Sequence, residues 1–157
     1  MIFGNTSIPK YSSSNDTLEH KSHVKENMRI LIDELILRAT THDDSKLKSP
    51  EKEIFDEYTP KLKNSTYMSD EYKDFLKEMN VALDHHYKHN PHHPEYHDDG
   101  ILGMTLVDLV EMICDWKAAS MRHSNGDIKE SIKCNKDRFG YSSELEQILL
   151  NTVNKYF

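Results

Sequence analysis

Apolar residues recur at intervals of three and four along most of the chain, which is the period of an amphipathic helix. The first such run contains Val24, Met28, Leu31 and Leu35 and predicts a helix over residues 17–38. No stretch alternates apolar and polar residues in the manner of a half-buried strand. The pattern therefore predicts an all-α fold.

Helix starts and breakers predict two shorter helices next. The sequence Ser-Pro-Glu at residues 49–51 is typical of a helix start, because proline and an acid are favoured in the first turn. Pro60 disfavours a helical conformation in the residue before it, so we expect this second helix to end near Thr59. A third helix is expected over residues 70–86, where apolar residues again share one face.

The remaining chain predicts a loop followed by three helices. Residues 89–100, HNPHHPEYHDDG, contain two prolines and a glycine and are expected to be irregular. A capping sequence, Thr105-x-x-Asp108, predicts a helix that runs to about residue 123. Two more helix starts follow, at Asp127 and Ser143. The prediction is a bundle of about six helices.

Length and composition agree with one soluble domain. The 157 residues are close to the roughly 150 expected of a domain. We expect residues 16–157 to form it and residues 1–15, which lack periodicity, to form a loosely held arm. No run approaches the ~20 apolar residues of a membrane span, and no signal peptide is evident, so we expect a cytoplasmic protein without a membrane partner. The net charge of −7 disfavours nucleic-acid backbones as partners. A homo-oligomer is compatible with the sequence.

Histidine is unusually frequent, with ten residues in all and six of them within residues 85–97. His20 lies on the apolar stripe of the first predicted helix, and His86 shares the apolar face of the third. The adjacent pair His42 and Asp43 offers an imidazole and a carboxylate to one divalent ion. Each residue alone is more simply interpreted as a core or cap residue. Their joint inward placement favours a shared metal-binding pocket.

The fourth predicted helix adds a line of acids to this set. Asp108, Glu111, Asp115 and Arg122 fall within roughly 60° of one another around a helix that is otherwise apolar and therefore buried. Acids in a buried helix are costly unless cations or a metal compensate them. A ladder of internal salt bridges with arginines is one interpretation, and a metal or substrate pocket is the favoured one.

The order of these residues resembles the HD-domain superfamily of metal-dependent phosphohydrolases, and implies an HD-domain-like helical fold. That family has a helical histidine, a His-Asp pair, further histidines and a late helical aspartate. The matching residues here are His20, His42, Asp43, Lys46, His86, one of His92, His93 or His97, and Asp115. His23 and Asp108 are alternatives to His20 and Asp115.

A closer likeness is carried by the strings HDDSKL, HH, NPHHPEYH and EMICDWKAA. They resemble bacterial and phage proteins of the DUF5662 type over residues 18–155. This second resemblance brings no activity with it.

The first resemblance implies hydrolysis of a phosphomonoester or phosphodiester, with a nucleotide as the expected substrate. One or two divalent transition ions (Mn, Co, Fe or Ni, with Mg or Zn as alternatives) would polarise the phosphoryl group and acidify a water. The implied ligands are His20, His42, Asp43, His86 and Asp115. The implied catalytic residues are Glu111, Asp108, Lys46 and His86, and the implied phosphate-binding residues are Lys46, Arg122, His93 and His97. The alternative is a non-catalytic metal-containing protein that binds a nucleotide signal or a protein partner, such as a phage accessory protein.

Overall fold

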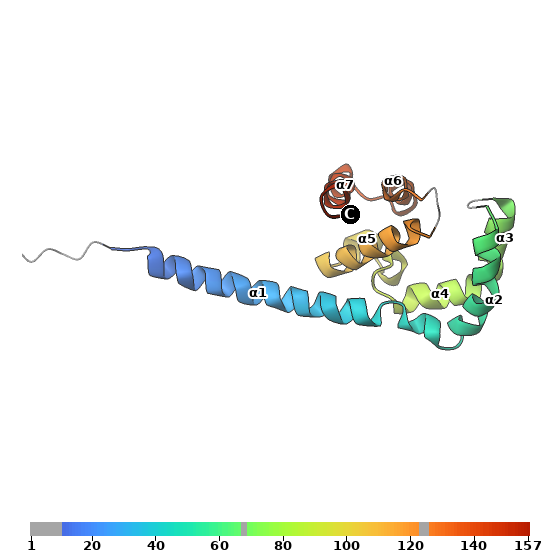
Figure 1. Cartoon of the computed structure of the whole chain (residues 1–157), viewed down its shortest axis with the longest axis horizontal. Coiled ribbons are helices and arrows are strands. Elements are labelled where there is room, and N and C mark those ends of the chain that lie inside the picture. Colours follow the sequence, from blue (N-terminus) through green and yellow to red (C-terminus); the bar gives the residue numbers. More distant parts are fainter. Residues whose placement is uncertain (1–10, 67–68, 123–125) are drawn as a thin grey trace, which may run out of the picture.

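The computed structural model describes residues 11–66, 69–122 and 126–157, and every regular element within these ranges is a helix (Figure 1). The predicted all-α class is confirmed. The described residues form seven α-helices and three short 3₁₀ helices, against the six helices expected. Most of the predicted arm lies outside the described residues. No helix in the described ranges combines the length and apolarity needed to cross a membrane.

The first helix, α1 (Ser14–Thr41), projects from the rest of the molecule (Figure 1). Its 28 residues correspond to a length of about 42 Å, and it extends three residues beyond the predicted helix at each end. Only its C-terminal part packs on another helix, α5 (Leu106–Ser120). Beyond it, Asp43 adopts a left-handed backbone conformation with a φ of 61°. This residue turns the chain into the short helix η1 (Asp44–Leu47).

Helices α2 (Glu51–Asn64), α3 (Asp70–Glu78) and α4 (Asn80–His89) form a group at the end of α1 (Figure 1). Two predictions were wrong here. Pro60 lies inside α2, because packing against α3 and α4 offsets the hydrogen bond that a helical proline removes. The third predicted helix is broken at Met79, which is 1% exposed. Burial of Met79 at this corner lets α3 and α4 run in different directions.

The hydrophobic core lies between α5, α6 (Ile128–Phe139) and α7 (Ser143–Tyr156). Its buried members are Met112, Ile113, Ile128, Ile132, Tyr141, Leu149 and Val153. The predicted capping box of α5 is present, with the Thr105 and Asp108 side chains each bonding to the other residue's backbone. One face of α5 thus belongs to the core. Another faces α1 and the loop after α4, which contains η2 (Pro94–Tyr96) and η3 (Gly100–Gly103).

Candidate metal centre

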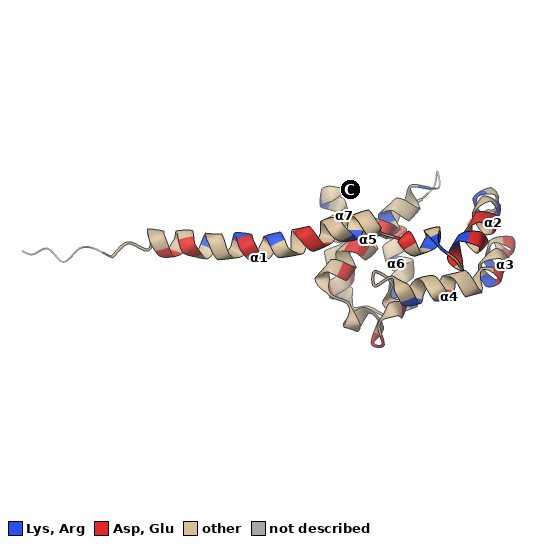
Figure 2. Cartoon of the chain, turned by 90° about the horizontal axis from the view of Figure 1, so that it is seen from below, with Lys and Arg blue, Asp and Glu red and all other residues tan. Residues whose placement is uncertain are grey.

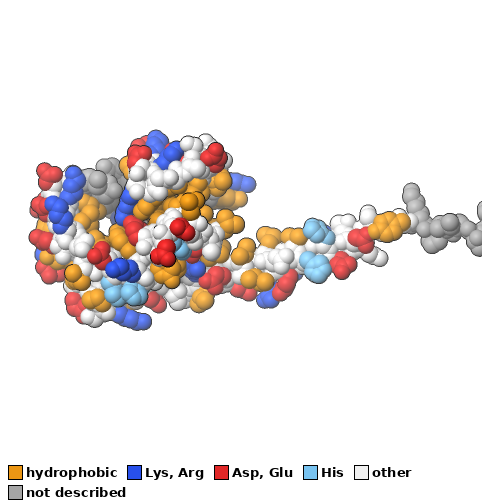
Figure 3. All heavy atoms as spheres, turned by 180° about the vertical axis from the view of Figure 1, so that it is seen from behind, with side chains coloured by type: hydrophobic (Ala, Val, Ile, Leu, Met, Phe, Trp, Pro, Cys, Tyr) orange, Lys and Arg blue, Asp and Glu red, His pale blue; other side chains and the backbone are white. Residues whose placement is uncertain are grey.

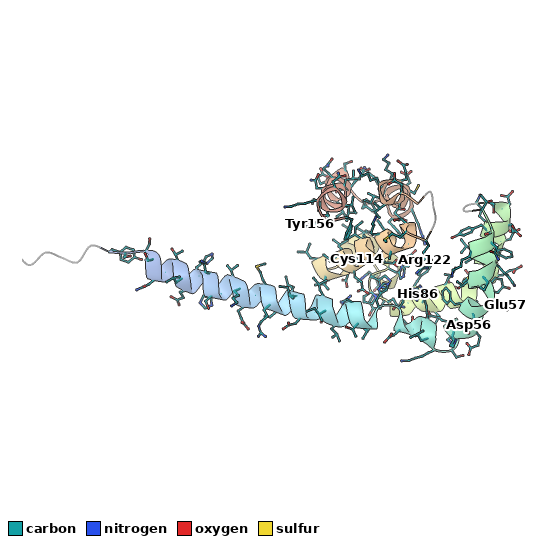
Figure 4. All side chains as sticks on the ribbon, viewed as in Figure 1. Asp56, Glu57, His86, Cys114, Arg122 and Tyr156 are labelled. Carbon is teal, nitrogen blue, oxygen red and sulfur yellow. The ribbon has the colours of Figure 1, made fainter. Side chains whose placement is uncertain are left out.

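Histidine and carboxylate side chains from four segments meet between α5, the end of α1 and α4 (Figure 4). The end of α1 and the turn after it supply two of them, and the others come from α4, from the loop that follows it, and from α5. The members are His42, Asp43, His86, His92, His93, Glu111 and Asp115. They separate into three overlapping groups, in each of which the ligand atoms lie within 4.8 Å of one another.

Three imidazoles direct their Nε2 atoms at the Asp43 carboxylate. The Nε2 atoms of His86 and His92 lie 3.2 and 3.6 Å from Asp43 Oδ1. The Nε2 atom of His42 lies 3.6 Å from Asp43 Oδ2 and 3.6 Å from Asp115 Oδ1. Separations of this size are those of two ligands that share one ion at about 2.1 Å. The arrangement therefore has the donor chemistry of a transition-metal site.

His93 adds a fourth imidazole to the group. Its Nε2 atom lies 3.0 Å from the Nε2 atom of His86. Two imidazole lone pairs at this distance repel each other unless a proton or a cation lies between them. Burial, followed by the neighbouring His92 and His86, lowers the pKa of His93 to about 3. His93 is therefore neutral at physiological pH, in the form that binds a metal.

The centre contains buried polar atoms without hydrogen-bond partners. Among the described residues, these are Asp43 Oδ1 and both ring nitrogens of His92. Leaving such an atom unsatisfied costs about 1–3 kcal/mol, so native structures keep few of them. Asp43 Oδ1 and His92 Nε2 face each other at 3.6 Å. A divalent cation held by these residues would satisfy both atoms.

Glu111 of α5 orients the His42 imidazole and lies close to the His92 imidazole. Its Oε1 atom accepts a hydrogen bond from His42 Nδ1 at 2.8 Å and lies 3.1 Å from His92 Nδ1. Its Oε2 atom accepts a hydrogen bond from Arg38 at 3.2 Å. A carboxylate that holds the Nδ1 proton leaves the Nε2 lone pair free for a metal, as is usual for metal-binding histidines.

Glu51, the first residue of α2, plays the same part for His86. Its side chain is fully buried, and its Oε2 atom accepts hydrogen bonds from His86 Nδ1 at 2.9 Å and from Ser45 Oγ at 3.0 Å. Its Oε1 atom accepts a hydrogen bond from His85 Nδ1 at 2.7 Å. Because a carboxylate only accepts hydrogen bonds, both Nδ1 atoms must carry protons. The Nε2 atom of His86 is then left as an acceptor facing Asp43.

Neighbouring charges keep the carboxylates of the centre ionised. Burial opposes the ionisation of Asp43, but the neighbouring His86 ring, 3.2 Å away, and the ammonium of Lys46, 2.6 Å away, hold its pKa well below the usual range. Hydrogen bonds with Asp115 and Glu111 raise the pKa of His42 to about 10. Without a metal, His42 therefore carries a proton on each nitrogen. The Nε2 proton faces Asp115 and Asp43, where a cation would replace it.

His20 is not among the residues that the structure brings together. It lies on the exposed part of α1, about 33 Å along the same helix from His42 at 1.5 Å per residue. His23, the alternative, lies on the same exposed stretch. The prediction that either is a ligand in its own chain was wrong, because it assumed that the chain turns back between residues 20 and 42. The segment instead continues as one straight helix.

Asp115, rather than Asp108, is the α5 aspartate at the centre. Asp108 accepts hydrogen bonds from the Thr105 backbone and hydroxyl at 2.7 Å and from Arg38 at 2.6 Å. These contacts outweigh burial and lower its pKa, and the imidazoles of His42 and His92 together with Arg38 do the same for Glu111. Carboxylates so committed are weak proton acceptors. The geometry thus argues against either residue acting as a general base, although both are among the implied catalytic residues.

The predicted phosphate-binding residues divide between the centre and its surroundings. Lys46 and His93 lie at the centre, whereas the His97 ring bonds to the Pro91 carbonyl at 2.9 Å and braces the loop. Arg122 lies in the turn that follows α5 and is exposed (Figure 4). Lys46 and Arg122 remain available to a ligand.

The sequence did not single out Glu51, and it left His92 as one of several alternatives. Glu51 was interpreted as an ordinary first-turn acid, and no local signal separates it from Glu53. For His92 the signal was the high frequency of histidine after α4. This signal does not distinguish His92, which is buried, from His97, which bonds to the backbone of the same loop.

Comparison with known proteins gives a family without an assigned role. A family described as "Family of unknown function (DUF5662)" matches residues 10–155, nearly the whole chain. No curated protein and no solved structure matches significantly.

Proposed function

This chain belongs to the DUF5662 family, and we propose that it is a metal-dependent phosphohydrolase that acts on a nucleotide or a related phosphoester. The observation that carries the proposal is the convergence of histidine Nε2 atoms on Asp43, with Asp43 Oδ1 and His92 Nε2 buried and unpaired. Such a donor set suits a divalent Mn, Fe, Co, Ni or Zn ion. The resemblance to HD-domain enzymes, in which a His-Asp pair has the same place, supports the choice of reaction.

When bound, the ion would act as a Lewis acid toward a phosphoryl oxygen and lower the pKa of a water molecule. The chain's own residues would then position the substrate. Lys46, with its ammonium at the edge of the centre and over the ring of Phe55, can pair with a non-bridging phosphate oxygen. Arg122, in the turn after α5, can hold a second phosphate group. These cations suit a substrate with more than one phosphate.

A second function, a metal-containing protein without turnover, has one observation in its favour. Asp43, His86, His92 and His93 form a group of four that could supply all the ligands of a single ion, and His42 and Asp115 form a second group with Asp43. An ion closed by protein ligands is typical of structural sites, whereas catalytic sites keep an open position. Two ions that share these six residues would have open positions. Metal stoichiometry therefore separates the two functions, with one ion per chain favouring a closed site and two favouring hydrolysis.

The test of catalysis is hydrolysis of nucleotides and phosphodiesters by tag-free protein loaded with Mn²⁺, Co²⁺ or Fe²⁺. We expect phosphate release that Asp43→Asn abolishes and that Asp44→Asn, a change of the neighbouring exposed acid, leaves intact. Lys46→Met should raise KM while metal content stays normal. A loaded protein that releases no phosphate from any substrate would overturn the enzymatic proposal and favour the binding protein.

A further inference from the structure

The projecting part of α1 exposes more apolar surface than a lone helix in water tolerates. None of its residues is buried, and eight of the nineteen large hydrophobic side chains recorded as exposed in the described residues belong to α1. Val24, Met28, Leu31 and Ile32 are 40, 57, 49 and 48% exposed. Figure 3 shows hydrophobic side chains along this stretch and on the adjoining part of the body.

These residues form one seam along the helix. Val24, Met28, Leu31 and Leu35 are spaced four, three and four residues apart, which is the heptad pattern of a helix that packs against another helix. The opposite side carries a ladder of charges, in which Arg29 pairs with Glu26 at 2.8 Å and with Asp33 at 3.5 Å. Figure 2 shows acidic and basic residues interleaved along α1. The charges on this side thus pair within the helix, although Ile30 and Leu37 are exposed there as well. The seam is uncovered from Val24 to Leu31, and Leu35 at its end is partly buried.

The surface area of the chain is larger than its mass explains. The chain exposes 11,691 Å², whereas a compact protein of 18.4 kDa exposes about 8,200 Å². An allowance of about 2,500 Å² for the residues outside the described ranges still leaves an excess of about 1,000 Å². A standard interface covers about 800 Å² of each partner. The excess is therefore large enough for one interface of ordinary size.

We propose that the α1 seam is the interface of a homodimer, in which the α1 helices of two copies pack against each other through Val24, Met28, Leu31 and Leu35. A second copy is the partner of matching chemistry, because it presents the same heptad seam, the same length and the same charged outer side. Closed, symmetric dimers are also the commonest assembly of soluble chains. Pairing would stabilise the projecting part of α1, because helices in proteins owe most of their stability to packing of an apolar face.

The test is the mass of the full-length protein by size-exclusion chromatography with light scattering, over a range of concentrations. We expect twice the chain mass of 18.4 kDa for the wild type and for Ile30→Glu. Met28→Glu should give the single-chain mass. Ile30 is a matched control, because it is 59% exposed against 57% for Met28 and points about 160° away around the helix.

Circular dichroism and metal content should match among the three proteins, which would show that loss of the dimer is not loss of the fold. A wild type that is monomeric at every concentration would overturn the proposal. The partner of the α1 seam would then be the chain's own N-terminal residues or another protein. A Met28→Glu variant that stays dimeric would place the interface elsewhere and overturn it equally.

Discussion

Replacing Glu51 with Gln should weaken metal binding although Glu51 itself touches no metal. The carboxylate accepts hydrogen bonds from His86, His85 and Ser45 in a fully buried position. Glutamine has nearly the same shape but keeps only one acceptor oxygen, and its NH₂ group donates. At least one imidazole must then turn over or change its tautomer. If it is His86, the proton moves to Nε2, the atom that faces Asp43.

The size of the effect follows from these contacts. Loss of an outer partner of a metal-binding histidine typically costs 10–100-fold in affinity, which corresponds to about 1.4–2.8 kcal/mol. The fold should also lose about 1.5–3 kcal/mol of unfolding free energy, the usual value of a hydrogen bond to a charged group. This cost is smaller than the stability of most domains of this size, so the variant should remain folded.

The assay is calorimetric titration of metal-free protein with Co²⁺, with urea unfolding of the same samples. The matched control is Glu57→Gln, which removes a charge from the same helix at a position that is 59% exposed and pairs only with Lys61 in the contacts described. The control should bind Co²⁺ as the wild type does. Unchanged affinity in a folded Glu51→Gln variant would refute the orienting role, as would an equal loss in the control.

Three further outcomes are expected. Arg38→Leu leaves Asp108, 3% exposed, without its cation, so the free energy of unfolding in urea should fall by about 3 kcal/mol. Arg29→Leu breaks an exposed ion pair and should cost under about 1 kcal/mol. Similar losses in the two variants would contradict this difference between buried and exposed pairs. His92→Ala should reduce Co²⁺ binding at least tenfold, while His89→Ala, whose exposed ring bonds to a backbone carbonyl and stacks on His85 outside the centre, should bind normally. A reversed order would show that the loop is misassigned. A chelator should lower the melting temperature of the metal-loaded protein by mass action, and an unchanged temperature would mean that no ion is bound.

Several parts of the fold were predictable because their signals are local. The helix starts at Thr105 and Asp127 depend on side chains that bond to the next turn, and both caps are present. The cap of α7 is Ser142, one residue before the predicted start at Ser143. The break at Met79 and the continuation of α2 through Pro60 were not predictable. Packing between helices decides both, and it contributes more than local propensity.

The candidate centre was predictable in its helical members and less so in its surroundings. His42 and Asp43 were recognised because they are adjacent in the sequence, and His86 and Asp115 because a polar residue on an apolar face is a local signal. His20 carried the same signal and was misplaced, although no proline or glycine separates it from the end of α1 and a continuous helix was the simpler expectation. The burial of Glu51 depends on α4, about thirty-five residues away, so local sequence could not reveal it.

The most direct test of a metal centre is elemental analysis of tag-free protein beside its Asp43→Asn variant. Asn is the suitable replacement because it tolerates the left-handed backbone at this position. We predict one or two transition-metal ions per wild-type chain and a large loss in the variant, with helicity unchanged by circular dichroism. A wild type that holds no ion after loading with Mn²⁺, Co²⁺, Fe²⁺ or Zn²⁺ would contradict the proposed centre, and so would a variant that retains the full content.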